Sequence, residues 1–167
     1  MPARIRPVEL QDLAELTRIY NHYITHTAIT FDVTTCTPEQ RRPWLTSFLG
    51  DGPQRCFVAD LDGPPIGWAC SGRFREKAAY DLSLETSIYL DPGATGRGLG
   101  TRLYQALFDD LANSDFHMAV GGVTLPNAAS VALHQRFGFE SVGVLREVGR
   151  KFDRYWDVQW FQKRLRN

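Results

Sequence analysis

The sequence has little cysteine, no excess charge of either sign and no long hydrophobic run. Its three cysteines form no Cys-x-x-Cys pair, so we interpret them as buried or half-buried thiols of a protein in the reducing cytoplasm. Nineteen basic residues balance nineteen acidic ones, which argues against a nucleic-acid partner or a membrane-surface partner. No apolar run approaches the roughly 18–20 residues of a membrane span, and residues 1–10 lack the apolar segment of a signal peptide.

The sequence is expected to form one domain, residues 1–167, and its composition is ordinary for a globular protein. Hydrophobic spacing and turn signals, such as Asp-Gly-Pro-Pro at residues 62–65, predict the secondary structure. Strands are expected at residues 3–7, 55–61, 66–73, 84–90, 117–123, 142–148 and 155–162, and helices at 10–24, 37–50, 99–111 and 127–137. This order predicts an α/β domain with a mixed sheet.

A glycine-rich segment, Thr-Gly-Arg-Gly-Leu-Gly at residues 95–100, separates a predicted strand from a predicted helix. It can be a turn that needs glycine, or a phosphate site, because helix N-termini expose unpaired N–H groups and a partial positive charge. A P-loop would have Lys-Ser or Lys-Thr after its last glycine, where this chain has Thr101-Arg102. A dinucleotide-binding fingerprint would follow G-x-G-x-x-G, whereas the spacing here is G-x-G-x-G. The loop alone leaves the turn and the phosphate site open.

This glycine segment and the later segment "NAASVALHQRFGF" resemble the GNAT family of N-acetyltransferases. The family pattern is Gln/Arg-x-x-Gly-x-Gly/Ala at the start of a helix, and residues 95–100 match it except at Thr95. The later segment has Asn127, a short helix and then Gly138-Phe139, as the family does. The resemblance spans the whole chain. It implies the GNAT fold, an α/β domain whose mixed, mostly antiparallel sheet of about six to seven strands is flanked by about four helices.

Four separated segments are similar to the phosphinothricin acetyltransferase subgroup of that family. They are "IYNHYI", "AYDLSLETSIYL", "LPN" with "LHQRFGF", and "GRKFDRYWDV". The resemblance implies transfer of acetyl from acetyl-CoA to the α-amine of phosphinothricin, methionine sulfone or methionine sulfoximine. It also implies that the glycine segment holds the pyrophosphate of acetyl-CoA, and that the protein is a homodimer.

Glu85 is the candidate base, because acetyl transfer needs a neutral amine and a group that takes its proton. Glu85 lies on the more polar face of the strand predicted within residues 82–90, where an ordinary surface glutamate would also lie. The resemblance implies the catalytic role, since Glu85 occupies the catalytic glutamate position of the subgroup. The proton transfer could run directly or through a water.

His134 is the second candidate catalytic residue. Many GNAT members carry a tyrosine at this position, and the subgroup uses histidine. The resemblance therefore implies that His134 donates a proton to the leaving thiolate or shares the work of the base. A helix histidine with a satisfied hydrogen bond is the alternative. Asn127 can cap the same helix and, by resemblance, contact the pantetheine arm.

The remaining site residues follow from the resemblance. For acetyl-CoA they are Ile88, Tyr89, Leu90, Thr95, Gly96, Arg97, Gly98, Leu99, Gly100, Thr101 and Asn127. For the acceptor they are Phe31, Phe74, Arg75, Glu76, Lys77, Tyr80, Glu85, Thr86, Ser87 and Lys151. Arginine and lysine suit the acidic groups of such an acceptor, although a charged loop is also a common solvated feature.

No metal is expected. His22 and His26 would share a helix face, but a metal needs a third ligand, and no acidic residue lies between them as in His-Glu-x-x-His. Two alternatives stand beside the small amino-acid acetyltransferase. One is the same chemistry on another small amine or a protein N-terminus, and the other is an acetyl-CoA-binding sensor without turnover.

Overall fold

The structure is a computed structural model that describes residues 3–166, so Met1, Pro2 and Asn167 of the predicted domain lie outside the described residues. The elements are β1 (Arg4–Pro7), α1 (Leu13–His26), α2 (Pro38–Thr46), β2 (Cys56–Asp60), β3 (Pro65–Arg73), β4 (Ser83–Leu90), α3 (Leu99–Leu111), β5 (Met118–Thr124), α4 (Ala128–Arg136), β6 (Glu140–Lys151) and β7 (Arg154–Arg164). Within residues 3–166 the seven strands form one sheet in the order β1-β2-β3-β4-β5-β7-β6. The predicted element order and mixed sheet are confirmed.

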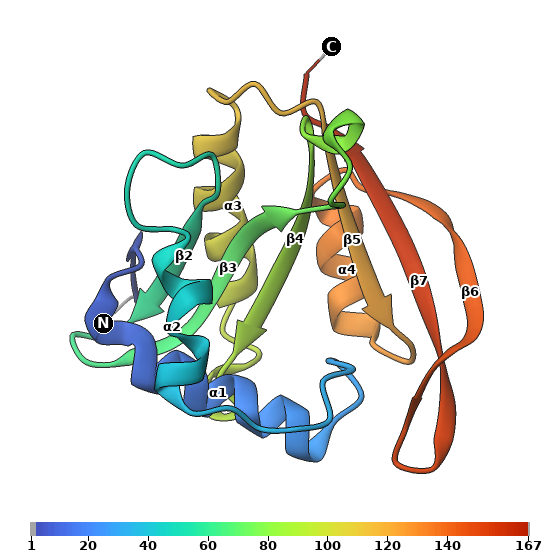
Figure 1. Cartoon of the computed structure of the whole chain (residues 1–167), viewed down its shortest axis with the longest axis horizontal. Coiled ribbons are helices and arrows are strands. Elements are labelled where there is room, and N and C mark those ends of the chain that lie inside the picture. The colour runs from blue at the N-terminus through green and yellow to red at the C-terminus, as the bar shows by residue number, and fades with distance from the viewer. Residues whose placement is uncertain (1–2, 167) are drawn as a thin grey trace.

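The sheet separates two helical layers (Figure 1), with α1 and α2 on one face and α3 and α4 on the other. Neighbouring residues of β3 show how the strand serves both layers. Trp68 packs with the α1 residues Leu16 and Ile19, whereas Ala69 packs in the cluster that contains Leu103 of α3. This follows from the two-residue period of a strand, which sends successive side chains to opposite faces.

The start of α2 is set by a capping box, as its sequence predicts. The Thr37 hydroxyl accepts a hydrogen bond from the backbone N–H of Gln40 (3.2 Å), and the Gln40 side chain accepts one from the N–H of Thr37 (2.9 Å). The helix was expected to end near Gly50, but it ends at Thr46. Past that point the backbone tightens into turns in which N–H groups bond three residues back, as Phe48 N–H does to the Leu45 carbonyl (3.1 Å).

β4 and β5 run parallel and separate after a short paired stretch. Their register extends from Ser83 opposite Met118 to Glu85 opposite Val120. Beyond Glu85, β4 continues to Leu90 paired with β3 alone, and β5 continues paired with β7. The two strands therefore diverge (Figure 1) and leave a wedge in the sheet that begins at Glu85.

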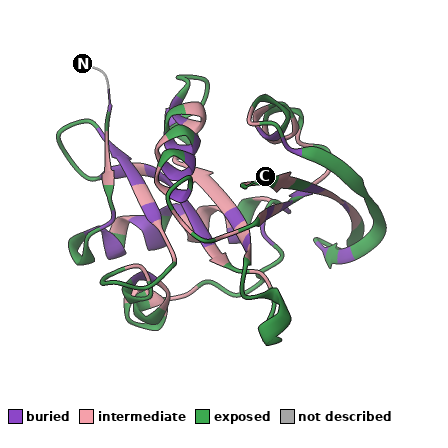
Figure 2. Ribbon diagram, turned by 90° about the horizontal axis from the view of Figure 1, so that it is seen from above, coloured by how far each residue is buried: buried purple, intermediate pink, exposed green. Residues whose placement is uncertain are grey.

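The hairpin of β6 and β7 projects from the far edge of the sheet, and most of β6 is exposed (Figure 2). The end of the hairpin next to its turn is attached to the loop that follows α1. The Lys151 ammonium donates a hydrogen bond to the Thr30 carbonyl (2.8 Å), and a Cβ at Gly149 would collide with the Phe31 ring. The lack of a side chain at Gly149 thus lets Phe31 lie against the hairpin.

Candidate active site

The wedge between β4 and β5 holds a cavity of about 800 Å³, a volume typical of a small-molecule site. Its lining comes from the end of α1 and the loop after it, β4, the start of α3, β5, α4, β6 and β7. The predicted site residues that line it are Phe31, Glu85, Thr86, Ser87, Ile88, Tyr89, Leu90, Thr95, Gly96, Gly98, Gly100, Thr101, Asn127 and His134. Segments far apart in the sequence are thus brought to one cavity.

Some predicted residues do not line this cavity. The Leu99 side chain is buried in the core with α3, and the Arg97 side chain is exposed outside the lining. Lys151 was expected as a free cation for the acceptor, but it is buried, and its ammonium is held by the Thr30 carbonyl. Burial also lowers the pKa of Lys151, and nearby Asp32 opposes that shift.

The predicted acceptor loop lies between β3 and β4, outside the cavity lining. Its side chains that the sequence singled out are Phe74, Arg75, Glu76, Lys77 and Tyr80. Phe74 and Tyr80 pack edge to face at 5.6 Å between ring centroids. The charge of Arg75 reaches Glu85 and acts against the rise of its pKa. The loop therefore lies at the Glu85 end of the wedge, where its part in acceptor binding stays a prediction.

The glycine segment forms the N-terminal entry of α3. Gly96 and Gly98 have φ of 75° and 72°, the left-handed region that glycine adopts at little cost. Gly98 caps α3 without a side chain, and a Cβ at either glycine would meet nothing within 4 Å. The first turn of α3 also carries no acidic residue. An open helix N-terminus with no side-chain cap and no acidic residue in its first turn is suited to a phosphate group.

Glu85 lies at the last paired position of β4, where the wedge opens. Its side chain is half-buried, and within residues 3–166 its carboxylate has no hydrogen-bond partner. Burial raises the pKa of Glu85 above its ordinary value of 4.5, and Arg75 partly opposes this rise. A carboxylate whose pKa is raised binds a proton more readily than usual, which suits it to act as a base.

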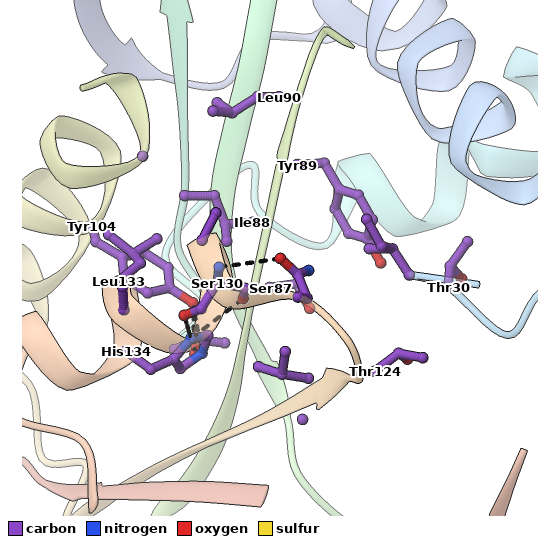
Figure 3. Close-up of a pocket in the computed structure, with 18 of the residues that line it drawn as sticks. Thr30, Ser87, Ile88, Tyr89, Leu90, Tyr104, Thr124, Ser130, Leu133 and His134 are labelled. Atoms are coloured by element: carbon purple, nitrogen blue, oxygen red, sulfur yellow. Dashed lines mark hydrogen bonds between the residues drawn. The ribbon is translucent and has the colours of Figure 1, made fainter. Parts of the chain in front are cut away.

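A cluster of polar side chains lies in the wall of the cavity (Figure 3). The Tyr104 hydroxyl lies 3.3 Å from the Thr86 hydroxyl and 3.3 Å from Nε2 of His134. His134 is also held from its other nitrogen, because Nδ1 lies 2.7 Å from the Ser130 carbonyl oxygen. Its ring stacks on Phe161 with centroids 5.2 Å apart, so both the position and the orientation of the imidazole are fixed.

The contacts of His134 also assign its protonation. Burial lowers the pKa of His134 below 6.5, so the ring is neutral at pH 7. The Ser130 carbonyl can only accept a hydrogen bond, which places the single ring proton on Nδ1 and leaves Nε2 as an acceptor facing Tyr104. Burial raises the pKa of Tyr104, so its hydroxyl keeps its proton. Neutral His134 thus accepts a proton at Nε2 more readily than it donates one there.

Sequence reasoning missed several lining residues, of which Tyr104 and Trp160 matter most. Tyr104 lies one helical turn after Gly100, so both face β4, and this spacing is the signal that could have found it. A second signal is the Gly121-Gly122 pair in β5. A Cβ at Gly121 would lie 2.7 Å from Nε2 of His134, and one at Gly122 would lie 3.4 Å from Trp160. Glycines in a strand mark close approach of other groups.

His22 and His26 stack at 4.6 Å between ring centroids, as their spacing predicts. Among residues 3–166, no group of three or more histidine, cysteine, aspartate or glutamate side chains could hold a metal ion. The described part of the chain also has no helix that is both long and apolar enough to cross a membrane.

Comparison with known proteins relates this geometry to a family. Residues 13–139 match the model of the acetyltransferase (GNAT) family. A phosphinothricin N-acetyltransferase of Streptomyces coelicolor is 53% identical over 97% of this chain and 96% of its own. An L-methionine sulfoximine/L-methionine sulfone acetyltransferase of Pseudomonas paraeruginosa is 32% identical over 99% and 96%. The crystal structure of a phosphinothricin acetyltransferase from Sinorhizobium meliloti in complex with acetyl-CoA superposes with a TM-score of 0.92, at 30% identity over 98% of this chain and 89% of that one.

Proposed function

Since the chain belongs to the acetyltransferase (GNAT) family and is an N-acetyltransferase that uses acetyl-CoA, we propose that its acceptor is the α-amine of a small amino-acid analogue. Phosphinothricin, methionine sulfone and methionine sulfoximine are the acceptors that the names of its relatives indicate. The observation that carries the proposal is the wedge, which places Glu85 and an open helix N-terminus on one cavity.

Acetyl-CoA would occupy the wedge from the α3 side. The backbone N–H groups of the glycine segment would bind its pyrophosphate, with Thr95 and Thr101 beside them. The edge of β4 that has no strand partner beyond Glu85, at Ile88 and Leu90, would hold the pantetheine arm and polarise the thioester carbonyl. Asn127 accepts a hydrogen bond from Ser130 N–H (3.2 Å) as cap of α4, which leaves its amide NH₂ group to reach the same arm.

Glu85 would act as the base. The amine nitrogen attacks the thioester carbonyl carbon, Glu85 takes a proton from that nitrogen directly or through a water, and the carbon–sulfur bond breaks to release the thiolate of CoA. No acyl-enzyme is needed. Cys36, Cys56 and Cys70 lie outside the lining of the cavity, which supports direct attack.

His134 would position Tyr104 rather than supply a proton to the leaving thiolate. The tautomer set by Ser130 leaves no proton on Nε2, and the neighbouring Tyr104 hydroxyl, 3.3 Å away, donates its own proton to Thr86. A thiol of pKa about 8.5 leaves readily as thiolate, so little acid help is required.

The acceptor would lie between Glu85 and the loop after α1. Phe31, Thr86 and Ser87 line that end of the cavity, and the loop with Arg75, Glu76 and Lys77 lies beside it. Lys151 would act by fixing the backbone before Phe31 through its bond to Thr30.

We also propose a homodimer. Val142, Val144, Leu145 and Val148 of β6 are large exposed apolar residues on one hairpin. Leu145 and Val148 also line the cavity, and exposed apolar residues of this kind are typical of an interface. Sedimentation velocity should give about twice the monomer mass, and a purely monomeric chain at micromolar concentration would contradict this proposal.

The function is tested by free-thiol release from acetyl-CoA with a panel of amines: phosphinothricin, methionine sulfone, methionine sulfoximine, ordinary amino acids, a polyamine and a short peptide. Turnover is expected with the first three. If thiol is released only with the ordinary amino acids, the polyamine or the peptide, the acceptor is another amine or a protein N-terminus. Bound acetyl-CoA without release across the panel would favour the sensor.

Substitution of Gly98 by alanine should weaken acetyl-CoA binding. Alanine at φ of 72° costs about 1–2 kcal/mol, and its methyl group would occupy the open space where the pyrophosphate is placed. We expect KM for acetyl-CoA to rise about three- to tenfold with KM for the amine unchanged. Gly63, in the exposed turn between β2 and β3, is the control, because its Cβ would also meet nothing and its φ is not in the left-handed region. Equal effects of the two variants would count against the pyrophosphate site.

A further inference from the structure

A second, smaller pocket lies on the opposite face of the sheet, between the α1–α2 layer and strands β3 and β4. Its volume is about 350 Å³. The residues that line it are Tyr20, Ile24, Asp32, Thr34, Cys36, Gln40, Arg41, Trp44, Trp68, Cys70, Ser87 and Tyr89. Ser87 and Tyr89 also line the acetyl-transfer cavity, so the two cavities share a wall.

Arg41 dominates the chemistry of this pocket. Its guanidinium carbon lies 3.9 Å from the ring centroids of both Tyr20 and Trp44, so aromatic rings cover both faces of the cation. Within residues 3–166 it makes no ion pair, and its buried Nε–H has no hydrogen-bond partner. Only the edges of the guanidinium remain for binding, and these are the edges that present N–H donors in a fork.

Trp68 adds a second unpaired donor to the same wall. Its side chain is completely buried, and its indole Nε1–H has no partner among the described residues. The Arg41 guanidinium carbon lies 5.7 Å from the centroid of the Trp68 ring, so both side chains border one small space. A buried N–H without a partner is costly, and most such groups in native proteins are paired. One water fills only about 30 Å³, so the pocket has room for a larger group beside these donors.

We propose that this pocket binds a carboxylate group, held by the guanidinium edge of Arg41 and by the indole N–H of Trp68. A planar carboxylate matches the arginine fork, and Arg41 is the one cation among the lining residues. Asp32 stands in the same lining, hydrogen-bonded by the Tyr20 hydroxyl (2.6 Å), and its charge opposes part of the attraction of Arg41 for an anion, most strongly for ligands with more than one negative charge. The aromatic rings suit a short apolar stem behind the acid.

The carboxylate could come from two sources. It could be the acid group of the acceptor itself, extending past Ser87 from the acetyl-transfer cavity, or a separate small carboxylic acid. Only the first source rests on the proposed function. The carboxylate site stands on the pocket, and its binding assay needs no turnover.

Binding is measured on the full chain by tryptophan fluorescence, since Trp44 and Trp68 lie in the wall. Sodium acetate and sodium propionate are titrated at constant ionic strength, with acetamide as the uncharged control ligand. Saturable binding of the carboxylates is expected, with no response to acetamide. Arg41→Gln should weaken it about tenfold or more, as loss of a charge-assisted bond predicts. Arg42→Gln is the matched control, because Arg42 is exposed on the same helix and does not line the pocket.

Trp68→Phe keeps an aromatic ring and removes only the N–H. It should weaken carboxylate binding several-fold. If a thermal melt shows that Arg41→Gln is not folded, Trp68→Phe is the variant that tests the carboxylate site. Absence of saturable carboxylate binding to the folded chain would overturn the proposal. So would equal affinity in wild type, Arg41→Gln and Trp68→Phe.

The source is assigned by kinetics with methionine sulfone. If acetate competes with the amine and Arg41→Gln raises KM for the amine at unchanged kcat, the acid of the acceptor occupies the pocket. If acetate still binds at saturating amine, the ligand is a separate carboxylate. Lack of turnover with every amine would remove the proposed function, and the fluorescence titration would still decide the site.

Discussion

Replacement of Glu85 by glutamine is expected to lower kcat for acetyl transfer by about 10²–10⁴-fold, the contribution typical of a positioned general base. Glutamine keeps the size and burial of the side chain at the mouth of the wedge but cannot take a proton from the amine. KM for acetyl-CoA should stay within about twofold, because the glycine segment and the β4 edge are untouched. Thiol release at saturating amine measures the effect.

The control for this change is Glu140→Gln. Glu140 is an exposed glutamate at the start of β6, away from the cavity lining, so its loss of charge should leave kcat unchanged. Unchanged turnover in Glu85→Gln would reject Glu85 as the base. If the wild type binds acetyl-CoA but shows no turnover either, the result would favour the acetyl-CoA-binding sensor.

The raised pKa of Glu85 gives this prediction a pH dependence. Glu85 must be ionised to act, so kcat should fall as pH drops through a pKa that lies above 4.5. The same shift has the opposite effect on stability. A carboxyl whose pKa is raised by folding favours the folded state below its unfolded pKa and loses that contribution as pH rises through its folded pKa. Glu85→Gln should therefore be slightly more stable than wild type at neutral pH, although it is far less active.

Truncation of Leu103 to alanine is expected to lower the free energy of unfolding by about 2–5 kcal/mol, the range for a fully buried leucine. Leu103 is 0% exposed and packs α3 against the sheet with Leu84 and Phe161. Urea unfolding measures the loss. Because α3 carries the glycine segment at its start, we also expect a weaker hold on acetyl-CoA, seen as a higher KM.

Leu61→Ala is the matched control for Leu103. It removes the same atoms from a side chain that is 45% exposed in the turn after β2, so the free energy of unfolding should change by about 0.5 kcal/mol or less. If Leu103→Ala lowers the free energy of unfolding no more than Leu61→Ala does, the packing of Leu103 does not hold α3 against the sheet.

The sequence predicts the elements of this fold well because each one carries its own local signal. The α3 stripe of Leu99, Leu103, Leu107 and Leu111 is buried as its spacing predicts. The capping box of α2 and the asparagine cap of α4 are also present. These signals depend on residues close together in the chain, and no tertiary contact overrides them.

What the sequence could not supply depends on contacts between distant segments. The separation of β4 from β5 after Glu85 leaves no mark in either strand, because both remain regular. Lys151 looks like a free cation in the sequence, but the fold brings it to the carbonyl of Thr30, 121 positions away. The pairing of Tyr104 with His134 joins two helices across the cavity in the same way.

The short pairing of β4 with β5 also makes the wedge a seam. Three residue pairs, from Ser83 to Glu85, join the sheet formed by β1–β4 to the sheet formed by β5, β7 and β6. A cosubstrate that contacts the start of α3 on one side and α4 on the other would connect these two parts of the sheet. By mass action, acetyl-CoA at a hundred times its Kd adds about 2.7 kcal/mol to the free energy of unfolding. The melting temperature of this protein should therefore rise with cosubstrate occupancy, so that the loaded enzyme is also the more durable one.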